Sequence, residues 1–265
     1  MIGELGLAAL AAKVAAAVFV VILSSRATEK AGPKVGSLIA TLPVSTGPVY
    51  VFLAMDHDAA FIADCARMSV ASSLAMLAYV WGHAFGSRRF ATAGSLACAI
   101  TAWLGAVLVL QLRQWSIAEA LAIYVITFGS SIYLLRGFTK VKAPASAPPK
   151  ARFDLLIRAG LVACVVLATT FAGRTSGPQL TGVIATFPTV FTSLILILQP
   201  RWGGAFTAAM MVNGLKGLVG FGLALAVVHF AAGFFQNSAI ALVLALAVAV
   251  GWNLGLAWLG RRAFR

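Results

Sequence analysis

The chain has 265 residues, of which 61% are hydrophobic and only 10% are charged, and it carries a formal net charge of +13. No soluble domain of this length tolerates so apolar a surface, so the composition excludes that class and predicts an all-α polytopic membrane protein. The positive charge raises nucleic-acid binding as an alternative, which depends on where the basic residues lie.

Nine segments are apolar over about the 20 residues that a membrane-spanning helix needs. They cover residues 4–25, 35–55, 58–84, 90–112, 115–135, 153–172, 179–199, 203–233 and 237–260. The first segment carries Glu4 in place of a basic start and is too long for the apolar region of a cleavable signal. We therefore expect it to remain as a span.

The basic residues between these segments are strongly asymmetric. Alternate loops hold fourteen of the twenty Lys and Arg, whereas the opposite loops hold only Arg113 and Arg174. By the positive-inside rule, this places the N-terminus outside and the C-terminus in the cytoplasm. The basic loops then need no partner beyond the lipid bilayer, so nucleic-acid binding is not expected.

A sequence repeat with an offset of 145 residues divides the chain. Gly32-Pro33, Ile39-Ala40-Thr41 and Pro43 recur as Gly177-Pro178, Ile184-Ala185-Thr186 and Pro188, without a gap. The predicted organisation is a four-helix repeat in residues 1–112, a linking helix in 113–136, a basic cytoplasmic linker in 137–152 and a second repeat in 153–265.

The two repeats begin five spans apart, which is an odd number, so they enter the membrane from opposite sides. Such 4+1+4 inverted-topology repeats are typical of secondary transporters, whose substrate site lies near the midplane at the repeat interface. The alternative is a fused antiparallel pseudo-dimer without transport. Either arrangement is compatible with a monomer.

Pro43 and Pro188 lie about nine residues into the second span of each repeat, where proline removes a backbone hydrogen bond. Each helix should kink or break near mid-membrane, and freed backbone groups there are tolerated only beside protein or a water-filled cavity. Thr41 and Thr186 precede the prolines by two residues. Their hydroxyl groups either satisfy a freed carbonyl or contribute to a ligand site.

Four basic residues fall within the spans, namely Lys13, Arg67, Arg158 and Lys216. Charged side chains in a span are costly and usually face the bundle interior, where they mark a substrate path. Lys13 and Arg158 align at the offset of 145, although Arg158 is also close enough to Asp154 to pair with it or to extend to the interface.

The other two cations are less symmetric. Lys216 is the most deeply embedded and shares a helix face with Asn213, three residues earlier. The alternative to a ligand contact is a neutral or internally paired lysine. Arg67 is a candidate lining residue that Asp64, three residues before it, can neutralise.

The sequence contains no arrangement typical of catalysis or metal binding. Cys65, Cys98 and Cys164 lie singly in apolar segments, and the three histidines have no metal-ligand spacing. We therefore expect no enzyme activity, no catalytic residues, no metal and no cofactor.

Three stretches carry a family resemblance, namely residues 155–160 (LLIRAG), 182–189 (GVIATFPT) and 94–103 (GSLACAITAW). Through them each half resembles the GlpM-like family of small four-span bacterial inner-membrane proteins, and the resemblance implies the bacterial inner membrane as the expected location. It implies a fused inverted duplication and an association with glycerol metabolism and polysaccharide production, and it assigns no role to Lys216.

The surplus of intramembrane cations over acids favours an anionic ligand. The sequence therefore predicts a secondary carrier or exporter of a small organic anion, in which Lys13, Arg158, Lys216, Asn213, Arg67, Thr41 and Thr186 bind the substrate. Two alternatives remain: a non-transporting membrane subunit of a polysaccharide or lipid synthesis system, and a flippase for a lipid-linked phosphate.

Overall fold

The computed structural model describes residues 4–30, 45–139, 141 and 153–262, and every regular element in them is helical. The elements are α1 (Glu4–Lys30), α3 (Thr46–Asp56), α4 (Ala59–Ser73), α5 (Ala75–Gly86), α6 (Thr92–Gln111), α7 (Ile117–Leu134), the 3-10 helix η1 (Leu135–Thr139), α8 (Asp154–Thr175), α9 (Gly177–Ala185), α10 (Thr189–Phe235) and α11 (Ser238–Arg262).

Six helical stretches of the described chain are long and apolar enough to cross a membrane. This composition and the helical fold agree with a membrane-embedded protein. Much of the span expected at 35–55 falls outside the described residues, and only its C-terminal part is seen, as the 11-residue helix α3. The count of nine spans therefore stays a prediction.

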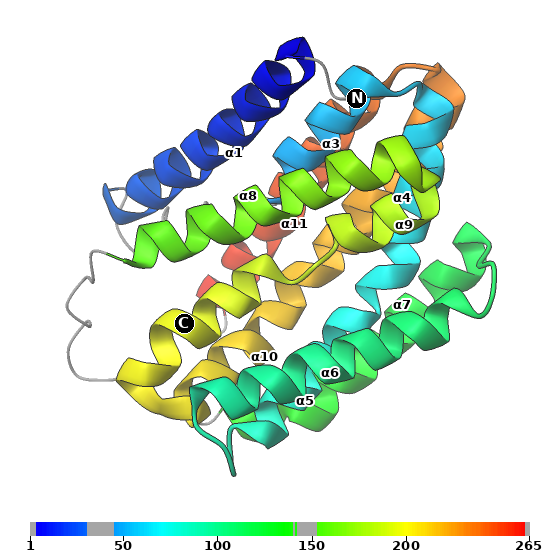
Figure 1. Ribbon diagram of the computed structural model, residues 1–265. Coiled ribbons are helices and arrows are strands. Elements are labelled where there is room, and N and C mark those ends of the chain that lie inside the picture. Colours follow the sequence, from blue (N-terminus) through cyan, green and yellow to red (C-terminus); the bar gives the residue numbers. More distant parts are fainter. Residues whose placement is uncertain (1–3, 31–44, 140, 142–152, 263–265) are drawn as a thin grey trace.

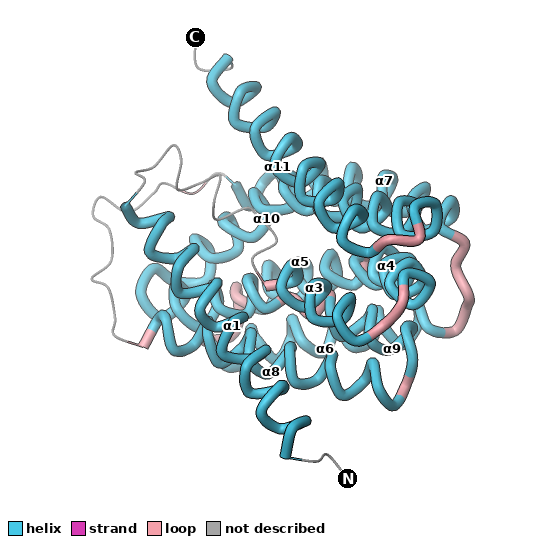
Figure 2. Tube along the Cα trace, turned by 90° about the horizontal axis from the view of Figure 1, so that it is seen from above, coloured by secondary structure: helices cyan, strands magenta, loops and turns pink. Residues whose placement is uncertain are grey.

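The helices form a bundle with distinct central and outer members. In Figure 1, α1 and α8 lie side by side along one edge, while α6 and α7 lie along the opposite edge. Helices α4, α9 and α10 pack between these edges. Figure 2 shows α11 extending away from the bundle toward its C-terminal end.

Burial follows this arrangement. In the most apolar window of the α4–α5 stretch 78% of the residues are buried, compared with 17% in α6. The close contact between α5 and α6 depends on glycine, because a Cβ at Gly82 would lie 2.7 Å from the backbone oxygen of Cys98. Small residues at helix contacts of this kind let backbones approach where lipid surrounds the bundle.

Helix α10 has 47 residues and is divided by a sharp kink at Gly203, with φ at +80°. A straight helix of this length would extend about 70 Å, far more than a bilayer requires. Glycine adopts this positive φ without strain from a side chain. Figure 1 shows the chain turning back here, in yellow to gold, between the spans predicted at 179–199 and 203–233.

Two segment starts lie 145 residues apart. Asp58 caps the start of α4, and the kink residue Gly203 lies at the equivalent position before the second part of α10. Beyond this pair of positions, the repeat stays a prediction from the sequence.

Candidate functional site

A helix break interrupts the path from α9 to α10. Helix α9 ends at Ala185 and α10 begins at Thr189, directly after Pro188. The hydroxyl of Thr186 donates to the carbonyl oxygen of Val183 at 2.9 Å, so it satisfies a carbonyl near the break. The interruption lies at Pro188, one of the two prolines singled out in the sequence, whereas Pro43 and Thr41 lie outside the described residues.

The start of α3 lies against this break. The hydroxyl of Thr46 donates to the carbonyl oxygen of Ala185 at 3.4 Å, and that of Thr189 donates to Ser45 at 3.0 Å. Two segments more than 130 residues apart in sequence therefore meet through hydroxyl and carbonyl groups in the bundle interior. In this region polar groups without partners would be costly.

Two further chains of hydrogen bonds connect the break to α3, α4 and α5. Tyr50 donates to Ser69 at 2.7 Å, and Ser69 donates to the carbonyl oxygen of Gly182 at 2.9 Å. The hydroxyls of Tyr79 and Thr192 lie 2.8 Å apart, and Thr192 donates to the carbonyl oxygen of Pro188. All four hydroxyl-bearing side chains are buried, so the break sits in a network of hydroxyl groups.

This network depends on a very close contact between α9 and α4. A Cβ at Gly182 would lie 2.5 Å from the backbone oxygen of Cys65 and 3.0 Å from the Cβ of Met68. No larger residue fits there without movement of backbone, which explains glycine at this position.

Lys13 is buried and forms an ion pair with Asp56, with its Nζ 2.5 Å from the Asp56 Oδ2. A second cation, Arg174, lies 3.8 Å from the same carboxylate oxygen. The sequence analysis does not identify Asp56 as the partner of Lys13. The signal was available, since Asp56 closes the second span at the end where Lys13 lies in the first.

His57 follows Asp56 and stacks on Phe61, with ring centroids 3.9 Å apart. Burial lowers the pKa of His57 from its ordinary value, and nearby Lys13 and Arg174 act in the same direction, against Asp56 and Asp58. The neutral imidazole is therefore favoured beside this group of charges.

Arg158 lies in different surroundings. Asp154, one turn earlier on α8, forms a bidentate pair with Arg201 of α10, of which one bond measures 2.8 Å. The suggested pairing of Arg158 with Asp154 is thus replaced by an inter-helix pair. The buried Nε of Arg158 has no hydrogen-bond partner, and within the described part of the chain no ion pair includes this residue.

The remaining predicted cations are placed as follows. Arg67 pairs with Asp64 at 3.4 Å, as the sequence suggested, and also donates to the carbonyl oxygen of Trp115 at 2.7 Å. Asn213 and Lys216 are exposed on α10, whereas we expected intramembrane charge to face the bundle interior. The backbone carbonyl of Lys216 accepts a hydrogen bond from the indole of Trp252.

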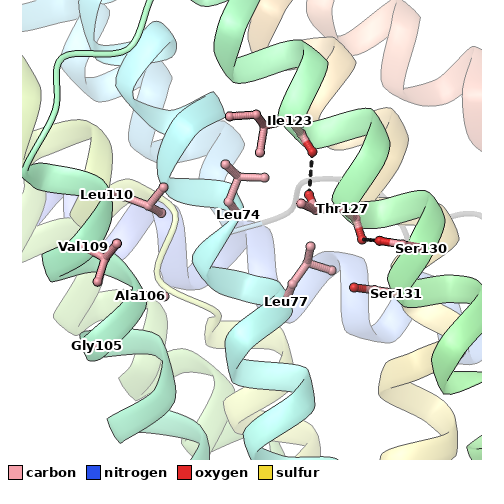
Figure 3. Close-up of a pocket in the computed structure, with 10 residues that line it drawn as sticks. All are labelled: Leu74, Leu77, Gly105, Ala106, Val109, Leu110, Ile123, Thr127, Ser130 and Ser131. Carbon is pink, nitrogen blue, oxygen red and sulfur yellow. Dashed lines mark hydrogen bonds between the residues drawn. The ribbon is translucent and has the colours of Figure 1, made fainter.

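A mainly apolar groove of about 500 Å³ separates α6 from α7 (Figure 3). Hydroxyl groups of α7 lie along one side, where Thr127 and Ser130 bond to backbone carbonyls of their own helix. Ser131 accepts a hydrogen bond from Trp81 of α5. The sequence alone does not predict this groove, because its shape depends on the angles at which three helices pack.

Comparison with known proteins gives no assignment: no family model, no curated protein and no solved structure matches the chain. In the described residues no three His, Cys, Asp or Glu side chains are grouped as metal ligands would be. What the structure provides is a break lined with hydroxyl groups and the guanidinium of Arg158, which has no acidic partner among the described residues. Both can donate hydrogen bonds to an anion.

Proposed function

We propose that the chain is a secondary carrier or exporter of a small organic anion in the bacterial inner membrane. Its architecture would be nine spans arranged as 4+1+4 inverted-topology repeats, with the site near the midplane where the repeats meet. The offset of 145 residues, the odd number of intervening spans and the broken second span support this arrangement.

The observation that carries the anion proposal is Arg158. A guanidinium is always charged and presents a fixed fork of donors that matches carboxylate and phosphate groups. Lys13 and Arg67 have acidic partners, and Lys216 is exposed, so the case for an anion now depends on Arg158. A bound carboxylate or phosphate would supply the counter-charge that the described residues around Arg158 do not provide.

The hydroxyl network at the break is suited to a translocation step. Hydroxyl groups exchange donor and acceptor roles at little cost, so Ser69, Thr186 and Thr192 can release backbone carbonyls and bond to a passing anion. Rocking of one repeat against the other would open the break alternately to each side of the membrane.

Uptake into liposomes tests this function. Purified protein is reconstituted and assayed for transport of inorganic phosphate, succinate and a small phosphate monoester, with and without a proton gradient. We expect uptake above that of empty liposomes, reduced at least about tenfold by Arg158→Gln, which corresponds to about 1.4 kcal/mol. Arg174→Gln, at an exposed cation, should change it little. Uptake equal to empty liposomes, or insensitive to Arg158, would reject the proposal.

A second candidate is a flippase for a lipid-linked phosphate, and the groove between α6 and α7 favours it. Its volume of about 500 Å³ and apolar lining suit an acyl or polyprenyl chain. For this function, Leu77→Trp would fill the groove and block movement of a fluorescent polyprenyl phosphate between leaflets. The same variant should leave transport of a soluble anion unchanged if the carrier proposal is right.

A further inference from the structure

The groove between α6 and α7 presents a mainly apolar surface (Figure 3). Its volume is about 500 Å³, and leucine, isoleucine, valine and alanine side chains form most of its lining. Its hydroxyl groups already bond within the protein: those of Thr127 and Ser130 donate to carbonyl oxygens of α7, and that of Ser131 accepts from an indole of α5. A hydrocarbon chain fits such a lining, whereas a soluble polar ligand would lose more hydrogen bonds to water than the groove can replace.

A row of aromatic side chains connects this groove to the η1 end of the bundle. The indole of Trp81 donates to Ser131 in the groove wall. Trp81 stacks on Phe85, and Phe85 meets Phe138 edge to face, each pair with ring centroids 5.5 Å apart. The guanidinium carbon of Arg88 lies 4.3 Å from the centroid of the Phe138 ring. Aromatic side chains therefore bridge the groove and this guanidinium.

Arg88 and Arg136 carry charges that no acidic side chain offsets within the described part of the chain. Both are exposed, and no ion pair there includes either of them. Arg136 lies on the ring of Tyr133, with its guanidinium carbon 4.1 Å from the centroid. The sequence from 65 to 153 contains one acid, Glu119, which lies at the opposite end of α7. The η1 end of the groove therefore attracts anions.

We propose that the groove holds an acyl chain of an anionic phospholipid and that Arg88 and Arg136 bind its headgroup phosphate. Basic groups at the membrane interface, beside a space between helices, are typical of anionic-lipid sites. Phosphatidylglycerol fits better than phosphatidylethanolamine, because the ammonium group of the latter is repelled by the two guanidinium groups. The bound lipid stays in the leaflet at the η1 end, unlike the substrate of a flippase, and this inference does not depend on transport.

Native mass spectrometry of the full-length protein tests the headgroup site. Protein stripped of lipid in detergent is titrated with phosphatidylglycerol or with phosphatidylethanolamine that carries the same acyl chains. We expect phosphatidylglycerol to bind at least about tenfold more tightly, and Arg88→Gln combined with Arg136→Gln to abolish this preference, since basic groups near the membrane surface attract anionic lipid. Arg113→Gln also removes an exposed cation, but at the opposite end of the groove, and should leave the preference in place.

Gly105→Phe on α6 tests the acyl-chain site separately. Gly105 lines the groove, and a Cβ there meets nothing within 4 Å, so the new ring can fill the groove without moving backbone. Gly129→Phe on α7 is the matched control, because its Cβ also meets nothing within 4 Å but the residue is outside the lining. We expect Gly105→Phe to weaken phosphatidylglycerol binding at least about tenfold, a difference that titration resolves, and Gly129→Phe to change it little.

Equal binding of the two lipids by the parent protein would overturn the proposal. Undiminished phosphatidylglycerol binding by Gly105→Phe, or by the double arginine variant, would overturn it as well. If the double arginine variant does not fold, the comparison of the two glycine variants decides. Failed uptake of anions with intact phosphatidylglycerol binding would reject the transport function alone.

Discussion

Lys13 and Arg158 align at the sequence offset of 145 residues, yet their electrostatic surroundings differ. Lys13 is paired with Asp56 at 2.5 Å. The residue equivalent to Asp56 is Arg201, which cannot neutralise Arg158 and instead binds Asp154. A repeated cation therefore does not imply a repeated ion pair, because the partner at the second position decides the charge of the site.

This difference in ion pairing also distinguishes a structural role, that of Lys13, from a functional role, that of Arg158. A buried cation with an acidic partner is expected to matter for folding, since either partner alone leaves an uncompensated charge. A cation without an acidic partner adds little to folding and remains available to a ligand. Stability measurements on single-residue variants of the full chain test this contrast.

The largest expected effect is that of Asp56→Asn, which leaves the Lys13 ammonium buried without a counter-charge. We expect a loss of about 3 kcal/mol in the free energy of unfolding, at the low end for a buried pair because Asp56 is partly exposed. Chemical unfolding in detergent measures it. Addition of Lys13→Met should restore most of the loss, since the unpaired charge is then removed.

Arg158→Met is the matched control in the other half and should change stability by about 0.5 kcal/mol or less, as for sites without a specific partner. If Arg158→Met costs as much as Asp56→Asn, Arg158 has a structural partner and the contrast between the halves is lost.

A smaller loss is expected for Gly182→Ala. The new methyl group would lie 2.5 Å from the backbone oxygen of Cys65, and overpacking of this kind typically costs about 1–3 kcal/mol. Gly160→Ala on α8 is the control, because a Cβ there meets nothing within 4 Å and alanine favours the helix. Equal stability of the two variants would show that α9 shifts freely on α4, contrary to the close approach of Gly182 to the Cys65 carbonyl.

The sequence was sufficient for the features with a local cause. Proline chemistry predicted the break at Pro188, three-residue spacing predicted the pair of Asp64 and Arg67, and apolar length predicted membrane-spanning helices. Partners from other helices could not be predicted in this way. Asp56 reaches Lys13 across 43 residues, and Arg201 reaches Asp154 across 47, so both depend on how the helices pack.

The smallest expected effect concerns His57, beside the ion pair of Lys13. Because the folded pKa of His57 is lowered, the unfolded chain binds its proton first as the pH falls below about 6.5. Stability contributed by the neutral imidazole is therefore present above that pH and lost as the pH falls toward the folded pKa. His57→Phe keeps a ring to stack on Phe61 but removes the titration, so its melting temperature should fall less between pH 7.5 and 5.5 than that of the parent protein. An equal fall in both proteins would mean that other groups cause the pH dependence. The contrast between Lys13 and Arg158 would then depend on the carboxylate of Asp56 alone.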